Sequence, residues 1–267
     1  CETPPCIATA LIRLGIPLID TIGHPIRFLD DLLNAWRSNH QGIAKELSKF
    51  RYELNFAKAH AGLIRAKMAW LPELQTPEET ALVIGQVGSD KALIHQEEGR
   101  LLGFHDFLDP LFEISERHPK VLYKAHPYED RYGHSANIIR RFKSFEKVNA
   151  NFYWLISQEN ISDVYAISSG TVTEAKYFEK KGTYFYKSPY DFDNPAGDTI
   201  SALSMPVPVE HAWLWPSFWH SILLPITQGL KPLSVVEPPY RANRIRRSIN
   251  ADWGFGAIDS VVNHHLR

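Results

Sequence analysis

Residues 81–90 read ALVIGQVGSD, an apolar run that ends in small and polar residues. An unbroken apolar run is expected of a parallel strand that helices cover on both faces. The pattern returns downstream in KVLYKAHP (120–127) and ISDVYAISSG (161–170). The three segments predict buried strands whose carboxyl ends carry polar side chains.

Strand and helix patterns alternate between about 80 and 190. Helices are predicted at FHDFLDPLFEISER (104–117), HSANIIRRFKSFEK (134–147) and TVTEAKYFEKKG (171–182), the last closed by Gly182. Further strands are predicted at NFYWLIS (151–157) and TYFY (183–186). This alternation predicts an α/β fold with a doubly wound, Rossmann-type sheet, in which ligands bind beyond the carboxyl ends of the strands.

The flanking regions are less regular. LDDLLNAWRSN (29–39) has a helical pattern, and residues 41–70 keep helical character over a length that often joins two lobes. HAWLWPSFWHSILLP (211–225) predicts a core helix, with a substrate-stacking platform as the alternative. RANRIRRS (241–248) predicts a helix with a solvated basic face, or else a contact with phosphate or membrane.

Composition narrows the class of protein. The chain has 267 residues, 44% of them hydrophobic, and a formal net charge of −1, so no overall basic field attracts nucleic acid. No run approaches the ~20 apolar residues of a transmembrane helix. We expect Cys1 and Cys6 to be reduced thiols, since no CxxC or zinc-binding pattern is present. The chain begins at Cys1, and we expect that residues precede it.

SSGTVTEA, residues 168–175, is the clearest phosphate-binding signal. Small residues at a strand end let the backbone approach a ligand, and the following helix presents N–H groups to an anion. Ser168, Ser169 and Thr171 would add hydroxyl donors. The alternative is a plain helix cap, because Glu174 follows Thr171 at the spacing of a capping box.

KAHP and GQVGSD are the other two signals. His126 would donate to a phosphate oxygen from a turn that Pro127 makes rigid, and Lys124 would add positive charge. The alternative is a structural His-Pro turn. In GQVGSD, Gln86 and Asp90 follow the first strand, and the Asp90 carboxylate is a candidate nucleophile, base or helix N-cap.

GQVGSD, YKAHPYED and ISSGTVTEAKYFEKKGTYFY, in this order and spacing, resemble the bacterial β-Kdo glycosyltransferases of the capsule polysaccharide biosynthesis group. The resemblance covers about 80–190 well and the rest weakly. It implies a GT-B-like fold, with residues 1–75 as the remainder of an amino-terminal acceptor lobe and a connecting helix. Residues 76–195 would be the CMP-sugar domain, and 196–267 helices and loops that pack across the lobes.

The resemblance also implies binding roles. Gln86, Lys124, His126, Ser168, Ser169 and Thr171 would contact a CMP-sugar donor. The family's PFYAGWG-like stretch is interrupted here, in PPYRANRIRRSINADWGFG, so no catalytic role is carried onto Tyr240 or Trp253.

A β-linked product from a β-configured CMP-Kdo donor means retention, which a double displacement achieves with a carboxylate nucleophile. Asp90 is the candidate nucleophile, and Glu2 the candidate acid/base, with a solvated chain end as the alternative for Glu2. Such a site requires neither a metal nor another cofactor. Asp191 and Asp193 leave a metal-dependent reaction open, although they lie in a predicted loop rather than at a strand end.

The implied partners are CMP-Kdo and a glycan or glycolipid acceptor in bacterial surface polysaccharide synthesis, with no nucleic acid. The implied location is the cytoplasm, with peripheral association with the inner membrane as an open alternative. Two other functions fit the same motifs. One is a sialyltransferase or another sugar-nucleotide enzyme of GT-B architecture. The other is a non-catalytic lobe that binds polysaccharide or acts as a scaffold.

Overall fold

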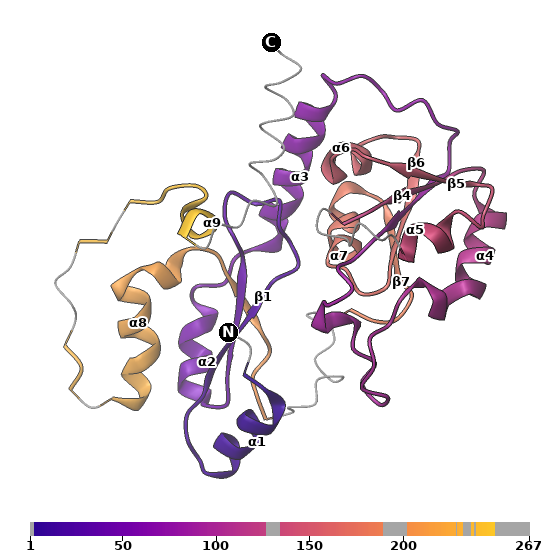
Figure 1. Cartoon of the computed structure of the whole chain (residues 1–267). Helices are drawn as coiled ribbons and strands as arrows, with labels where there is room; N and C mark the ends of the chain where they lie inside the picture. Colours follow the sequence, from indigo (N-terminus) through magenta and orange to yellow (C-terminus); the bar gives the residue numbers. More distant parts are fainter. Residues whose placement is uncertain are drawn as a thin grey trace. The chain divides into compact units, whose positions relative to one another are not determined.

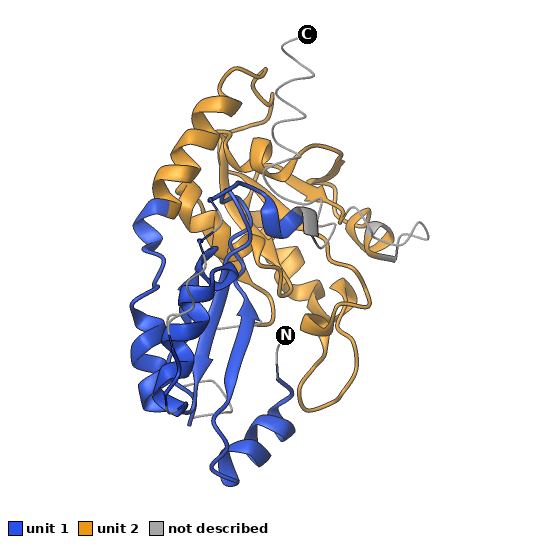
Figure 2. Cartoon of the chain, turned by 90° about the vertical axis from the view of Figure 1, so that its left-hand side faces the viewer, with its two compact units in different colours: residues 1–56, 190–255 blue, residues 57–189, 256–267 orange. Residues whose placement is uncertain are grey.

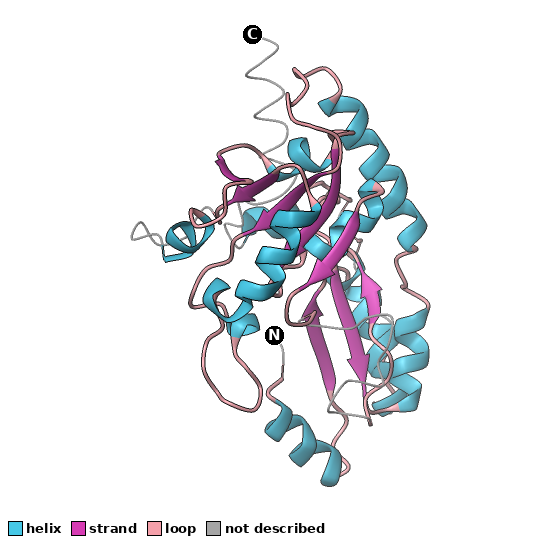
Figure 3. Cartoon of the chain, turned by 90° about the vertical axis from the view of Figure 1, so that its right-hand side faces the viewer, coloured by secondary structure: helices cyan, strands magenta, loops and turns pink. Residues whose placement is uncertain are grey.

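The computed structural model describes residues 3–126, 134–188, 202–227, 229–231, 236–237 and 239–248. The chain forms two compact units (Figure 2). Unit 1 combines the chain up to Phe56 with a segment that begins at Tyr190, and unit 2 runs from Ala57 to Pro189. Each unit has a sheet of its own, shown in magenta in Figure 3.

Unit 2 is built on a five-stranded sheet in which every neighbouring pair is parallel. Its order is β5-β4-β3-β6-β7. The strands are β3 (Thr80–Ile84), β4 (Val121–Lys124), β5 (Phe145–Val148), β6 (Ile161–Ala166) and β7 (Lys181–Tyr184). In chain order this is 3-2-1-4-5, the order of the doubly wound Rossmann sheet. The predicted α/β, Rossmann-type fold is confirmed.

Helices cover both faces of this sheet. Helices α4 and α5 lie on one side, and α6 and α7 on the other (Figure 1). Right-handed crossovers produce this arrangement, because the chain leaves β3 in one direction and β6 in the other. The helices of unit 2 are α3 (Leu54–Met68, beginning in unit 1), η1 (Lys91–Leu93), η2 (Phe104–Phe107), α4 (Leu108–Arg117), α5 (His134–Ile139), α6 (Phe152–Ile156), α7 (Thr171–Ala175) and η3 (Lys176–Phe178).

The apolar runs of the sequence form the core of unit 2. All five residues of β3 are buried, as is expected of the central strand of a covered parallel sheet. On one face, Val83 and Tyr123 pack with Phe104 and Leu111 from the helices. Pro110 lies in the first turn of α4, where its missing N–H costs no hydrogen bond.

Unit 1 is built on a three-stranded antiparallel sheet of order β1-β2-β8. The strands are β1 (Ile19–Gly23), β2 (Asn34–Ser38) and β8 (Val207–Val209). The helices are α1 (Pro5–Arg13), α2 (Gln41–Ser48), η5 (Ala212–Leu214), α8 (Pro216–Leu223), η6 (Leu224–Ile226) and α9 (Arg244–Ser248). Trp36 of β2 packs edge-on against Phe218 of α8, with 5.4 Å between the ring centroids. The tryptophan-rich segment thus contributes to a core, as predicted.

Four buried charged side chains, in two separate clusters, organise unit 1. Arg37 Nε donates to Asp20 Oδ2 at 2.9 Å between neighbouring strands. The Asp31 carboxylate accepts from the backbone N–H groups of Ile245 and Arg246 at the start of α9. Arg246 is 4% exposed and donates to the carbonyl of Leu29. The prediction of a solvated basic face is therefore wrong for Arg246, whose guanidinium ties α9 to the 27–31 segment.

Several predicted elements differ from the structure. Residues 34–38 of the predicted helix 29–39 form β2, and the predicted long helix 41–70 is interrupted between Ser48 and Leu54. Residues 152–156 form a helix instead of a strand, and residues 145–147 of the predicted helix 134–147 belong to β5. Gly182 lies in β7; the helical segment before it ends at Glu179, whose φ is 62°.

The unit boundaries also differ from the predicted ones. We predicted a central domain over 76–195, whereas unit 2 begins at Ala57 and its first continuous segment ends at Pro189. The difference arises because most of α3 belongs to unit 2, not to an amino-terminal lobe. No described helix combines the length and the apolar character that crossing a membrane requires.

Candidate functional site

The three segments predicted to bind the donor, GQVGSD, KAHP and SSGT, begin at one edge of the unit 2 sheet. β3 lies between β4 and β6, and Ile84, Lys124 and Ala166 are in register at their carboxyl ends. The segments after them are therefore neighbours. Strand order reverses between β3 and β6, and a crevice at such a reversal is where open α/β sheets bind ligands. This edge is our candidate site.

Gln86 and Ser168 link the two strands that flank the reversal. Gln86 Oε1 accepts from the Ser168 N–H at 2.7 Å, and Gln86 Nε2 donates to Ser168 Oγ at 3.1 Å. Gln86 is 9% exposed and Ser168 1% exposed, so the pair is closed off from solvent. This arrangement ties the segment after β3 to the segment after β6. Direct contact of either side chain with a donor stays a prediction.

Ser169 and Thr171 are more accessible than Ser168. Ser169 Oγ accepts from the Thr171 N–H at 3.4 Å and from Thr171 Oγ1 at 3.0 Å. Gly170, not Thr171, occupies the N-cap position of α7, so the predicted Thr171 cap is wrong by one residue. Glu174 is buried and accepts from Tyr153 Oη at 3.0 Å. Because α7 has only five residues, we rest anion binding on side chains and not on a helix dipole.

Lys124 and His126 follow one another along the end of β4. Both are half-buried. Burial lowers the pKa of the Lys124 ammonium, because a partly desolvated site penalises the charged form. An anion bound nearby would offset that penalty. Lys124 is thus suited to a phosphate ligand, and His126 lies two residues further along the same strand end.

Asp90 serves as a helix cap in this structure. Its Oδ1 accepts from the Ala92 N–H at 2.9 Å at the start of η1. The side chain is partly exposed. The hydrogen bond holds the carboxylate in one orientation, which is compatible with a cap alone and with a positioned nucleophile. Its catalytic role stays a prediction.

The other predicted acid lies outside the described residues. That acid is Glu2. Pro127, Tyr128, Glu129 and Asp130, which follow His126, also lie outside the described residues. Within the described part of the chain, no group of three or more His, Cys, Asp or Glu side chains is arranged to hold a metal ion.

The structure adds residues that the sequence analysis did not single out. Tyr186, just beyond β7, stacks on His95 with 5.5 Å between ring centroids, and its hydroxyl accepts from the Gln96 N–H at 3.2 Å. Thr173 and Tyr184 join their hydroxyls at 2.7 Å. Tyr184 and Tyr186 share the position of the predicted site residues, since both lie at or beyond the carboxyl end of a parallel strand.

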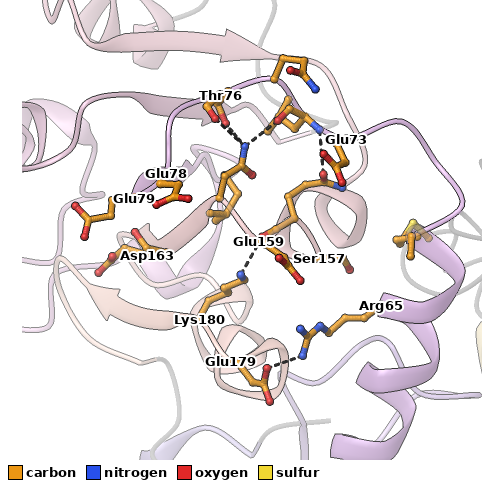
Figure 4. A pocket seen from close by; sticks show the side chains of 18 of the residues that line it. Arg65, Glu73, Thr76, Glu78, Glu79, Ser157, Glu159, Asp163, Glu179 and Lys180 are labelled. Atoms are coloured by element: carbon orange, nitrogen blue, oxygen red, sulfur yellow. Dashed lines mark hydrogen bonds and ion pairs between the residues drawn. The ribbon is translucent and has the colours of Figure 1, made fainter.

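A hollow of about 1040 Å³ lies at the opposite edge of the same sheet (Figure 4). Its lining includes Glu79 before β3, Asp163 in β6 and Lys181 at the start of β7, so it opens at the amino ends of the strands. Lys180 points into it and donates to the Gln158 carbonyl at 2.9 Å. Its many carboxylates disfavour a phosphate, so we place the candidate site at the carboxyl edge despite the size of this hollow.

Comparison with known proteins gives a distant structural likeness. No protein-family model matches the sequence, and no curated protein matches it. Among solved structures, KpsC from Thermosulfurimonas dismutans, a beta Kdo 2,7 transferase, is similar at 16% sequence identity with a TM-score of 0.40. The match covers 69% of this chain and 64% of that one, so the chain spans less than two thirds of that structure's length. The fold assignment rests on the strand order, and nothing about activity is taken from this likeness.

Proposed function

We propose that the chain is the donor-binding part of a glycosyltransferase that moves Kdo from CMP-Kdo to a glycan or glycolipid acceptor with retention. The observation that carries the proposal is the convergence of GQVGSD, KAH and SSGT on adjacent parallel strands, at the strand-order reversal. The same three motifs, in this order, carry the resemblance to the β-Kdo glycosyltransferases.

The proposed site stabilises the leaving CMP. When the bond between C2 of Kdo and the phosphate oxygen breaks, the bond's electron pair and its negative charge pass to the phosphate. The proposed charged and polar donors are the Lys124 ammonium at the end of β4, a His126 N–H two residues later, and the Ser169 and Thr171 hydroxyls after β6. Fixed donors at the developing charge are the largest single contribution in many such reactions.

Retention requires two displacements. The Asp90 carboxylate attacks C2 as CMP leaves, which forms a glycosyl ester. The acceptor hydroxyl then attacks C2, loses its proton to the second carboxylate, and releases Asp90 as a free carboxylate. Glu2 is the proposed second carboxylate. The proposal requires no metal ion and no cofactor, and it assigns the enzyme to the cytoplasmic synthesis of a bacterial surface polysaccharide.

Calorimetric titration of this chain with CMP and with UDP tests the donor class. We expect CMP to bind and UDP to bind at least about tenfold more weakly, since a site that hydrogen-bonds one base leaves polar groups unpaired with another. Equal affinity for both nucleotides, or preference for UDP, would point to another sugar-nucleotide enzyme. Release of CMP from CMP-Kdo by the full-length protein, in the presence of a Kdo-containing acceptor, would exclude a non-catalytic lobe.

A further inference from the structure

Helix α3 is apolar on two opposite faces. One face packs into the protein, with Ala57, Ala61, Ile64 and Met68 almost fully buried. Large apolar side chains on the other face are open to solvent. Phe56 is 60% exposed, Leu63 is 63% exposed, and Trp70, in the turn that closes the helix, is 81% exposed. A helix with apolar residues on both faces is normally buried on both.

The exposed apolar residues follow a heptad. Phe56, Leu63 and Trp70 are seven residues apart, at position a, and Ala59 and Ala66 fall at position d between them. Gly62 and Ala69 lie beside this row at position g, and all four small residues are exposed. We call these seven residues the α3 stripe. An a/d repeat of this kind is the spacing by which one helix packs against another.

The stripe alternates large and small side chains, and this selects the partner. In a parallel pair a residue at a faces a on the partner, so Leu63 would meet Leu63 and Ala59 would meet Ala59. Reversing one helix makes each a position face a d position instead. Phe56 then meets Ala66 and Leu63 meets Ala59, so each of these layers pairs one large side chain with an alanine, and Trp70 lies beyond them. A second, reversed copy of the same stripe is thus its own complement, as a two-fold interface requires.

The charges that flank the stripe agree with this arrangement. Glu53, one residue before α3, and Lys67 both fall at position e, on the same edge of the stripe. In a reversed pair the e positions of the two helices face each other, and Glu53 of one copy lies beside Lys67 of the other. The opposite edge carries Gly62 and Ala69, which let the two backbones approach closely.

We infer that two copies of this chain associate through the α3 stripe, as an antiparallel helix pair about a two-fold axis near residue 61. The inference uses only α3 and the residues that directly flank it, and it does not depend on the proposed enzymatic activity. It explains why a helix with one buried face also carries an exposed leucine, phenylalanine and tryptophan.

Sedimentation velocity tests the association. We expect the chain to dimerise with a dissociation constant in the micromolar range. Leu63→Glu should weaken the dimer by about tenfold or more, since it removes a buried leucine from a central layer. Phe112→Glu is the matched control, because Phe112 on α4 is 57% exposed and lies outside the stripe. A monomer at all concentrations, or a dimer that survives Leu63→Glu, overturns the inference, as does stripe-dependent binding of a monomer to lipid vesicles.

Thiol cross-linking tests the orientation. In a Cys1→Ser, Cys6→Ser background, Gly62→Cys should be captured as a dimer by a short bifunctional reagent, since Gly62 faces its own copy near the axis. A Cβ at Gly62 meets nothing within 4 Å, so the substitution fits α3. Phe56→Cys should not be captured, because ten residues, or about 15 Å, separate it axially from its copy. Capture of Phe56→Cys but not Gly62→Cys would show a parallel pair and overturn the inference.

Discussion

Lys124 is half-buried at the end of β4, and burial lowers its pKa from the ordinary value of 10.5. In the free protein at neutral pH, the charge on the partly buried Lys124 therefore lowers the free energy of unfolding. This loss shrinks as the pH rises above the lowered pKa, because the folded protein then releases the proton. A bound phosphate favours the charged form. We expect CMP affinity to fall as pH rises through that lowered pKa, below 10.5.

Lys124→Met should weaken CMP binding by about tenfold or more at neutral pH, the usual loss for a hydrogen bond to a charged group. It should also abolish the alkaline decline in affinity without lowering the melting temperature. Lys120→Met, at the other end of β4, is the control. It should keep the affinity for CMP and the decline of that affinity at alkaline pH. An unchanged pH profile in Lys124→Met would show that this ammonium does not contact the nucleotide.

His126→Ala should weaken CMP binding by about 1–3 kcal/mol, measured by calorimetry, because an imidazole N–H to a phosphate oxygen is a charge-assisted bond. His105→Ala, on an exposed side chain of η2, serves as the control. Unaltered affinity with an intact fold would assign His126 to the turn alone.

Asp90→Asn separates the two roles of Asp90, since asparagine caps a helix as well as aspartate does. If the carboxylate is the nucleophile, the full-length variant should bind CMP normally but lose transfer by about three orders of magnitude or more. The wild type, given CMP-Kdo without acceptor, should carry one Kdo on the peptide that contains Asp90. Asp109→Asn in the first turn of α4 is the control. Near-normal transfer by Asp90→Asn would rule out the nucleophile.

At the scale of elements, Gly182 of β7 packs closely against Val172 of α7. A Cβ at Gly182 would come within 2.9 Å of Val172 Cγ1 and still closer to the Val172 carbonyl oxygen. Gly182→Ala should therefore lower the free energy of unfolding by about 1–3 kcal/mol in urea denaturation. Gly88→Ala, where a Cβ meets nothing within 4 Å, should change it little. Equal stability of the two variants would mean that β7 shifts freely from α7.

The elements that could be predicted are those with one dominant signal. β3, β4 and β6 are short segments rich in apolar residues, and the small or polar residues that follow each of them mark the end of a strand. Their polar ends fixed the position of the candidate site. Tyr186 was missed because β7 is a short strand and the hydrogen bond to Gln96 crosses 90 residues.

The elements that were predicted wrongly depend on contacts between distant residues or on helix caps. Residues 152–156 form one short apolar run, which fits a strand or a buried helix equally well. Asn151 was the missed signal, since its Oδ1 accepts from the N–H groups of Tyr153 and Trp154 as an N-cap. The break after α2 depends on Tyr52, whose N–H donates to the distant Pro208 carbonyl.

At the scale of the whole molecule, we propose that unit 2 binds the nucleotide, and we expect the two edges of its sheet to differ in their affinity for phosphate. The carboxyl edge presents Lys124, His126, Ser169 and Thr171. The amino edge presents a large hollow in which carboxylates outnumber the basic side chains (Figure 4). We expect a nucleotide phosphate to prefer the carboxyl edge, because the carboxylates of the hollow repel it.

A crystal structure of the chain with CMP tests the central claim most directly. We expect the CMP phosphate beyond the ends of β3, β4 and β6, within hydrogen-bond distance, about 2.7–3.2 Å, of His126 and of the Ser169 or Thr171 hydroxyl. CMP bound in the amino-edge hollow beside Lys180, or on unit 1 against its tryptophans, would contradict it.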